Sequence, residues 1–99
     1  MSAQPQIHYM VELSTGHLPY EICRSLADYD AVIAYPLTAG ADSFGWLLPV
    51  PDHQQPTDPD RQLPAELVAI YRYARLIGCT YILLDRDANT IADLPLWDW

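Results

Sequence analysis

The stretch that specifies its own structure most clearly is Leu63-Pro-Ala-Glu-Leu-Val-Ala-Ile-Tyr-Arg-Tyr-Ala-Arg-Leu-Ile-Gly-Cys-Thr-Tyr-Ile-Leu-Leu-Asp85. Pro64 and Glu66 suit the first turn of a helix, where a missing N–H is harmless and negative charge is favoured. Gly78 is the residue expected just past a helix end, because it readily adopts positive φ. Residues 80–84 then form a strand that is apolar on both faces. Between Pro64 and Gly78, apolar residues recur at helical spacings of three and four: Leu67, Ile70, Tyr71, Ala74 and Ile77.

The composition indicates one small acidic domain spanning residues 1–99. Hydrophobic residues make up 51% of the chain, which suffices for a core at this length. Thirteen Asp and Glu face five Arg and no Lys, so the net charge is −8. That charge argues against direct binding to nucleic acid and against anionic membrane surfaces, both of which need cations. It is equally consistent with a charge that only keeps protein molecules apart in solution.

The sequence predicts a cytoplasmic protein, in the host cell that makes it, without cofactor or metal. Residues 1–6 lack the pattern of a signal peptide, and no run of about 18 apolar residues would span a membrane. Cys23 and Cys79 are expected to be free thiols rather than a disulfide. The histidines are scattered, and there is no Cys-x-x-Cys, so no metal-ligand spacing is present: His8, His17 and His53.

Hydrophobic periodicity also predicts the first strand and the first helix. Residues 7–13 alternate apolar and polar side chains, which is typical of a half-buried strand. Pro19 and Glu21 then mark the first turn of a helix. This helix is expected to end around residues 28–30.

Two further strands are expected at residues 31–37 and 44–50, joined by a hairpin loop at 38–43. Pro36 and Pro49 each remove a backbone donor from these strands. They therefore indicate an edge, a bulge or a strand end at those two positions.

The predicted order is β-α-β-β-α-β, which is the ferredoxin-like pattern of an α+β domain. That fold has a four-stranded, mainly antiparallel sheet with two helices on one face. In it the last strand lies at an edge, yet residues 81–84 look buried on both sides. Either the C-terminal tail covers that strand, or the strand order differs.

Two segments outside this pattern stand out by composition. Residues 51–62 are rich in Pro and Asp and predict an exposed loop. The tail at residues 88–99 is too apolar to extend into water, and we expect it to pack back on the body or to form a binding surface. Its apolar side chains are Leu94, Leu96, Trp97 and Trp99.

The first pattern that suggests catalysis is Asp85-Arg-Asp87, directly after the buried strand. Paired carboxylates after a strand resemble the start of phosphotransferases that use Mg²⁺ and an aspartyl nucleophile. However, Asn89 stands where those enzymes have Thr or Val, and no Lys exists to hold a phosphate. A solvated turn stabilised by local Asp and Asn bonds to the backbone is the simpler interpretation.

Ser14, Thr15 and His17 precede the first predicted helix and offer a second, weaker possibility. Ser and His form nucleophile–base pairs in some enzymes, and a helix N-terminus attracts anions. No third member of a catalytic set can be named from the spacing. Capping and turn formation explain these residues more simply.

Arg72, Tyr73 and Arg75 are expected on the exposed face of the second helix, with Tyr71 in the core. Tyr and Arg are the residue types that anchor protein interfaces. Together with Trp97 and Trp99 they would serve as a binding surface, and whether that surface builds a homodimer is left open.

The segments 13–18, 45–47, 78–88 and 93–99 together resemble a family of small uncharacterised proteins, encoded on plasmids, phages and integrated elements near antirestriction genes. The resemblance implies a context rather than an active site. Mobile elements carry small proteins that disarm host defences, including anti-CRISPR and antirestriction proteins. Pro19 stands where relatives would have a capping Thr.

Charge and resemblance together predict a small non-enzymatic inhibitor of the anti-CRISPR or antirestriction type, which binds a nucleic-acid-targeting defence complex of the host. It would block a basic surface or act there as a DNA mimic, which requires several aligned carboxylates. The alternatives are a metal-dependent enzyme using Asp85 and Asp87, or an interaction module of a mobile element with no inhibitory role. The residues predicted to bind the partner are Asp52, Asp58, Asp60, Asp85, Asp87, Asp93, Tyr73, Trp97 and Trp99.

Overall fold

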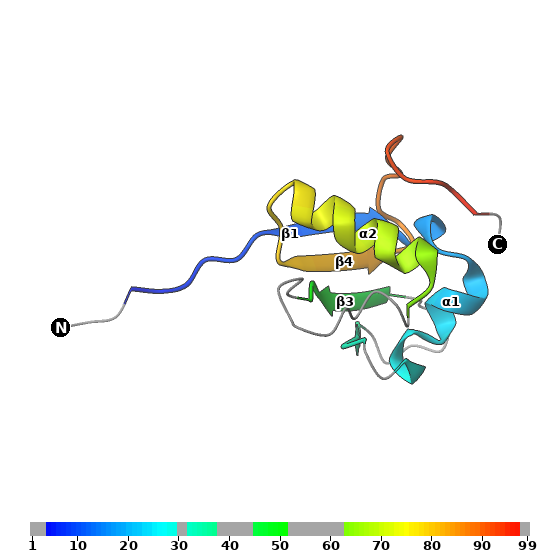
Figure 1. Cartoon of the computed structure of the whole chain (residues 1–99), viewed down its shortest axis with the longest axis horizontal. Coiled ribbons are helices and arrows are strands. Elements are labelled where there is room, and N and C mark those ends of the chain that lie inside the picture. The colour runs from blue at the N-terminus through cyan, green and yellow to red at the C-terminus, as the bar shows by residue number, and fades with distance from the viewer. Residues whose placement is uncertain (1–3, 30–31, 38–44, 52–62, 98–99) are drawn as a thin grey trace.

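The computed structural model describes residues 4–29, 32–37, 45–51 and 63–97 (Figure 1). The described elements comprise four strands, two α-helices and two 3-10 helices. They follow one another as β1 (Met10–Ser14), η1 (Thr15–His17), α1 (Tyr20–Arg24), η2 (Leu26–Asp28), β2 (Tyr35–Pro36), β3 (Gly45–Pro49), α2 (Ala65–Leu76) and β4 (Tyr81–Asp85).

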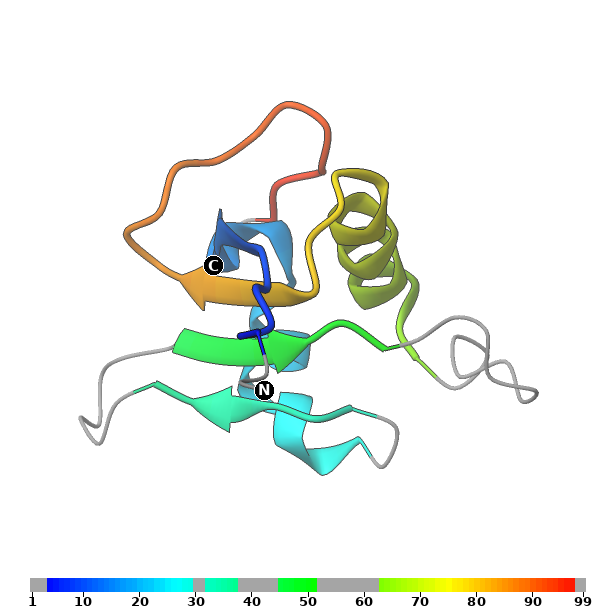
Figure 2. The same cartoon turned by 90° about the vertical axis from the view of Figure 1, so that its left-hand side faces the viewer.

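The four strands form one mixed sheet with the order β1-β4-β3-β2. β1 and β4 run parallel, whereas β4 pairs antiparallel with β3, and β3 antiparallel with β2. Figure 2 shows the strands stacked in this order, with α2 on one side of the sheet. The prediction of an α+β domain with four strands and two helices is therefore confirmed.

The strand order differs from the predicted ferredoxin-like one, because β4 lies inside the sheet and not at its edge. The reason is the apolar character of β4 itself. Ile82 and Leu84 are fully buried, and Leu83 on the other face is half-buried. A strand of this kind needs neighbours on both sides. β1, whose Met10 and Glu12 are exposed, takes the edge position in its place.

The core lies between α2 and one face of the sheet, which we call the inner face. Register pairs Leu13 with Leu84, and Ile82 with Leu48, so these apolar side chains point the same way. Each is fully buried and contributes roughly 1.5–3 kcal/mol relative to exposure. α2 covers them with side chains that are themselves buried: Leu67, Val68, Ile70, Tyr71 and Ala74.

The first helix and the second strand are much shorter than predicted. α1 has five residues and lies beyond the carboxyl ends of β1 and β4 (Figure 1). It ends where the Ser25 hydroxyl donates a 2.6 Å hydrogen bond to the Glu21 carbonyl, a bond that competes with helix continuation. β2 has two residues and is the edge strand that Pro36 indicated, and Pro49 ends β3. The predicted hairpin loop at 38–43 lies outside the described residues.

α2 ends as the sequence predicts, at a glycine with positive φ. Gly78 has φ 81°, and its N–H donates to the Arg75 carbonyl at 3.1 Å. The next N–H, that of Cys79, reaches back to the Ala74 carbonyl at 2.8 Å. This pair of bonds satisfies the last helical carbonyls and turns the chain directly into β4.

Replacing Gly78 by Ala should lower the free energy of unfolding by about 1 kcal/mol, because an L side chain is strained at this φ. A Cβ at Gly78 would meet nothing within 4 Å, so crowding adds nothing to the cost. Gly78→Asn is the matched control, since Asn tolerates the left-handed region better. Urea unfolding of the three proteins measures this, and equal stability of Gly78→Ala and the wild type would contradict it.

Candidate functional site

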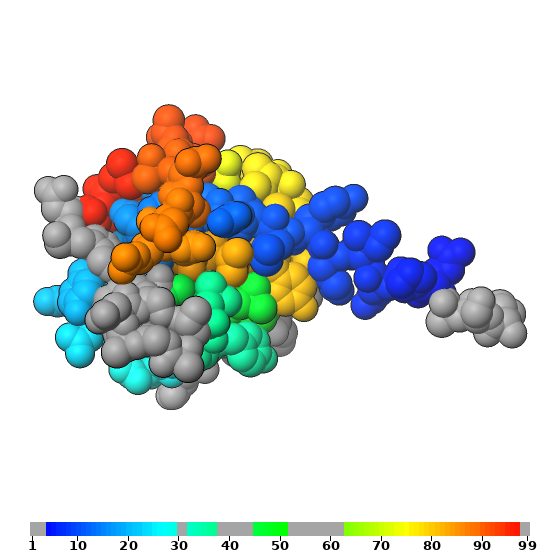
Figure 3. Space-filling model, turned by 180° about the vertical axis from the view of Figure 1, so that it is seen from behind, coloured from blue at the N-terminus to red at the C-terminus, as the bar shows by residue number. Residues whose placement is uncertain are grey.

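No helix of the described residues packs on the face of the sheet away from α2, which we call the outer face. Its middle row runs Glu12, Leu83, Leu47 and Tyr35 across the four strands, as the register shows. A neighbouring row holds Met10, Tyr81 and Pro49. Figure 3 shows this face, with β4, β3 and β2 reaching the surface and the tail crossing above them.

The outer face is mainly apolar yet partly exposed. Tyr35 and Met10 are 56% and 52% exposed, and Leu47, Leu83 and Tyr81 are half-buried. A contiguous apolar surface of this kind marks a place where proteins bind other molecules. The periodicity of the strands was visible in the sequence, but the neighbours of each residue were not.

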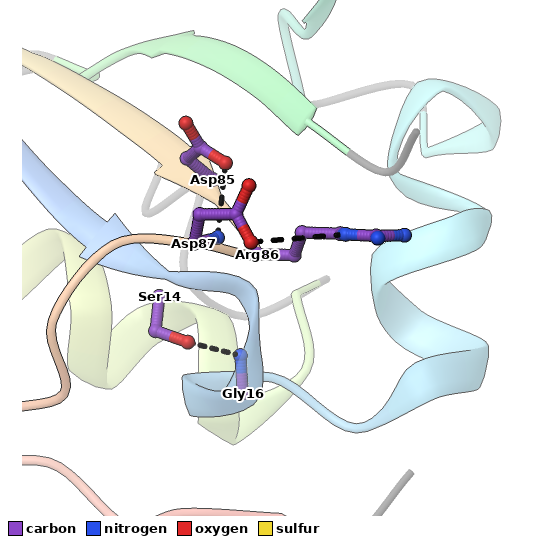
Figure 4. A network of polar contacts seen from close by, with 5 residues as sticks. All are labelled: Ser14, Gly16, Asp85, Arg86 and Asp87. Atoms are coloured by element: carbon purple, nitrogen blue, oxygen red, sulfur yellow. Dashed lines mark hydrogen bonds and ion pairs between the residues drawn. The ribbon is translucent and has the colours of Figure 1, made fainter. Parts of the chain in front are cut away.

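Two polar turns meet at one corner of this face, where β1 and β4 end side by side. Ser14 and Asp85 are register partners at the carboxyl ends of these parallel strands. The Ser14 hydroxyl accepts a 3.1 Å hydrogen bond from the Gly16 N–H, and the Asp85 carboxylate accepts one of 3.0 Å from the Asp87 N–H. Figure 4 shows both bonds. Each side chain therefore stabilises its own turn, as the simpler interpretation of these sequences predicts.

Beside these turns lies a shallow polar hollow of about 210 Å³, lined by Glu12, Asp87, Ala88 and Asn89. Asp87 also faces Arg86, whose Nε lies 4.0 Å from its carboxylate, with both side chains well exposed. Such an exposed pair contributes little to stability. Glu12, Asp85 and Asp87 thus form a small group of carboxylates, which we call the acidic corner.

The C-terminal tail is fastened to the body through His17, which is only 1% exposed. His17 Nδ1 donates to the Pro95 carbonyl at 2.9 Å, and Nε2 accepts from the Ile91 N–H at 3.0 Å. The backbone N–H of Trp97 donates to the Gly16 carbonyl at 2.9 Å. Both ring nitrogens of His17 are occupied by the tail, so this histidine holds structure and has no nitrogen left to serve Ser14 as a base.

The structure brings together only some of the predicted partner-binding residues. Asp85 and Asp87 lie at the acidic corner, and Asp93 is exposed on the tail. Tyr73 is half-buried against the core, and Trp97 is 41% exposed. The remaining predicted residues, Asp52, Asp58, Asp60 and Trp99, lie outside the described residues, as does most of the predicted loop at 51–62.

The cationic residues predicted beside Tyr73 behave differently from one another. Arg75 is half-buried, and its Nε and Nη2 donate to the Pro51 carbonyl at 3.3 and 3.0 Å. It also lies over the ring of the buried Tyr71, 6.0 Å from the centroid. Arg75 therefore ties α2 to the end of β3, and only Arg72 is fully at the surface.

Sequence reasoning missed Glu12 and the role of His17. Glu12 is an ordinary polar position of an alternating strand, and only the parallel pairing with β4 brings it to the hollow with Asp87. Across the described part of the chain, no three His, Cys, Asp or Glu side chains gather as metal ligands. Nor is any described helix long and apolar enough to cross a membrane.

Both cysteines are free thiols. Cys23 is fully buried, and burial raises the pKa of its thiol from 9.0 to about 11, against a smaller lowering by the neighbouring Trp46 side chain. Between these two pH values the thiol would ionise only in the unfolded chain, so its contribution to stability is complete below pH 9.0 and is lost on the way to about 11.

His17→Ala should lower the free energy of unfolding by about 1–3 kcal/mol, because it leaves the Ile91 N–H and the Pro95 carbonyl without their partner. Hydrogen exchange at the Ile91 amide should also become faster. Asp93→Ala is the matched control, because Asp93 is exposed on the same tail. It should change stability by less than about 0.5 kcal/mol. Unchanged Ile91 exchange in His17→Ala would contradict the fastening role.

Cys23 and Cys79 should differ sharply in thiol reactivity at neutral pH. Cys79 is half-buried and should react with Ellman's reagent in the native protein. Cys23 should react only after denaturation, since it is fully buried and the thiolate is the reactive form. The Cys79→Ser variant identifies the fast thiol, and two fast thiols in the native wild type would refute the assignment.

The comparison with known proteins gives one family. The sequence model described as "Family of unknown function (DUF5983) C-terminal domain" matches residues 10–99, from the start of β1 onward. No curated protein and no solved structure matches the chain.

Proposed function

The chain belongs to the DUF5983 C-terminal domain family, a family of unknown function, and we propose that it is a non-enzymatic binding protein whose outer face covers a basic surface of a partner. The partner we infer is a nucleic-acid-targeting complex of host defence. The chain would then be an inhibitor of the anti-CRISPR or antirestriction type. The observation that supports this most directly is the apolar outer face, which no described helix covers, with carboxylates grouped at one corner.

The chemistry of this face suits a basic protein surface. Tyr35, Leu47 and Leu83 offer apolar area for the centre of an interface, where aromatic and aliphatic side chains give most of the affinity. Asp85 and Asp87 stand at its margin, where charge steers a cationic partner into place. The net charge of −8 acts in the same direction over a longer range.

The described carboxylates favour steric blocking over imitation of a long DNA segment. Duplex DNA carries one charge per about 1.7 Å, so the three carboxylates of the acidic corner match roughly 5 Å of duplex. Arg86 lies within this corner and offsets one of the negative charges. We therefore infer that the apolar face provides the contact area and that the acidic corner guides its placement.

The test is inhibition of DNA cleavage by a panel of purified CRISPR effector complexes and restriction endonucleases. Wild-type protein should inhibit at least one member, and inhibition should weaken as salt rises. Asp85→Asn with Asp87→Asn should weaken it roughly tenfold at low salt, as expected for two marginal charges. Asn at position 85 keeps an oxygen for the turn bond to the Asp87 N–H.

The matched control removes two negative charges elsewhere: Glu21→Gln with Asp28→Asn, on α1 and η2. It has the same net charge as the test variant but leaves the acidic corner intact. Equal loss in both variants would show that only overall charge matters. A Leu83→Glu variant that inhibits as well as the wild type would refute the use of the outer face.

A further inference from the structure

We propose that the outer edge of β1 binds a second copy of the chain. The two β1 strands pair antiparallel about a two-fold axis at Met10 and join both sheets into one. This inference does not depend on the proposed function, because it concerns the edge of the sheet and not its outer face.

The first observation is the direction of the backbone groups of β1. The Tyr9 carbonyl accepts hydrogen bonds from the N–H groups of Thr80 and Tyr81, at 2.9 and 3.2 Å, so the backbone of Tyr9 faces β4. In a strand, alternate residues direct their N–H and C=O to opposite sides. The backbone groups of His8, Met10 and Glu12 therefore face away from β4. β1 is the last strand of the sheet on that side, so within the described residues no strand pairs with them.

The second observation is the apolar surface at the same place. Ile7, Tyr9 and Met10 are 78%, 68% and 52% exposed, on and just before β1. Leu76 and Ile77, at the end of α2, are 84% and 46% exposed. In Figure 1 this end of α2 lies beside the start of β1, where the N-terminal segment leads away from the body. Long exposed edges flanked by apolar side chains are templates for pairing with another chain.

The third observation is charge. Thirteen acidic residues make copies of this chain repel one another, yet residues 1–11 contain no Asp, Glu or Arg, and neither do residues 76–84. His8 and Tyr9 therefore contact Thr80 and Tyr81 in a part of the chain that contains no Asp, Glu or Arg. A basic partner would gain nothing here from the acidic surface, whereas a second copy avoids its own repulsion.

The register about Met10 follows from complementarity. It places Met10 opposite its own counterpart, Tyr9 opposite Val11, and His8 opposite Glu12 of the other copy. His8 has a ring N–H to offer a carboxylate, and its ring already lies edge-on to Tyr81 on the outer face, at 5.4 Å. A register centred on Glu12 would instead oppose two carboxylates. The Met10 register therefore turns the one charge on this edge into an attractive contact.

The mass of the full chain in solution, measured by sedimentation equilibrium, shows whether it is a monomer or a dimer. The wild type should give twice the monomer mass of 11.2 kDa. Met10→Pro removes an outward N–H without touching the Tyr9 bonds to β4 and should give monomer, whereas Met10→Ala should remain dimeric. His8→Glu should weaken dimerisation by opposing Glu12, and adding Glu12→His should restore it. A monomeric wild type, or a swap variant no stronger than His8→Glu, would overturn the proposal.

Cross-linking tests the register in a Cys79→Ser background. Directly opposed residues of a hydrogen-bonded antiparallel pair have Cα atoms about 5.5 Å apart, within the range of a disulfide. Met10→Cys should therefore form a disulfide-linked dimer on mild oxidation. Glu12→Cys is the matched control, because its counterpart would be displaced by four residues, roughly 13 Å. Faster cross-linking of Glu12→Cys than of Met10→Cys would overturn the register.

Discussion

The structure depends on the central position of β4. Ile82 and Leu84 are buried on the inner face, while Tyr81 and Leu83 are half-buried on the outer face, so this strand requires a neighbour on each side. β3 supplies one neighbour in antiparallel pairing and β1 the other in parallel pairing. The position of β4 fixes β1 as an edge strand and brings the carboxyl ends of β1 and β4 to the same end of the sheet.

That shared end accounts for both the acidic corner and the course of the tail. Because β1 and β4 are parallel, the turns that follow them emerge together, with Ser14 and Asp85 as register partners. The chain after β4 then passes close to η1, where His17 binds the tail backbone at two points. An antiparallel β1–β4 pair would have sent these two turns to opposite ends of the sheet. The acidic corner and the fastened tail are thus consequences of one pairing choice.

What the sequence predicts well is local. The limits of α2, its glycine end and the strand after it follow from spacing, from φ preference and from apolar runs, all within a few residues. The turn bonds at Ser14 and Asp85 are local too, and composition indicated them. By contrast, the hydrogen bonds of His17 reach residues that lie 74 and 78 positions further along the chain. Glu12 likewise comes near Asp87 only through the pairing of β1 with β4. Strand order is likewise a competition among distant segments, which no single stretch decides.

The uneven distribution of charge in the described residues separates two surfaces. Asp85, Asp87 and Glu12 gather where β1 and β4 end, whereas the segments that lead into the start of these strands, residues 4–9 and 76–80, contain no Asp, Glu or Arg. Repulsion between copies of an acidic chain is weakest where such charge is absent, and attraction of a basic partner is strongest where it is concentrated. Pairing along β1 would leave both outer faces on the same side of one continuous sheet, because the two-fold axis of an antiparallel pair is perpendicular to it. A second copy and a basic partner therefore meet at Met10 and Glu12, which belong both to the β1 edge and to the outer face.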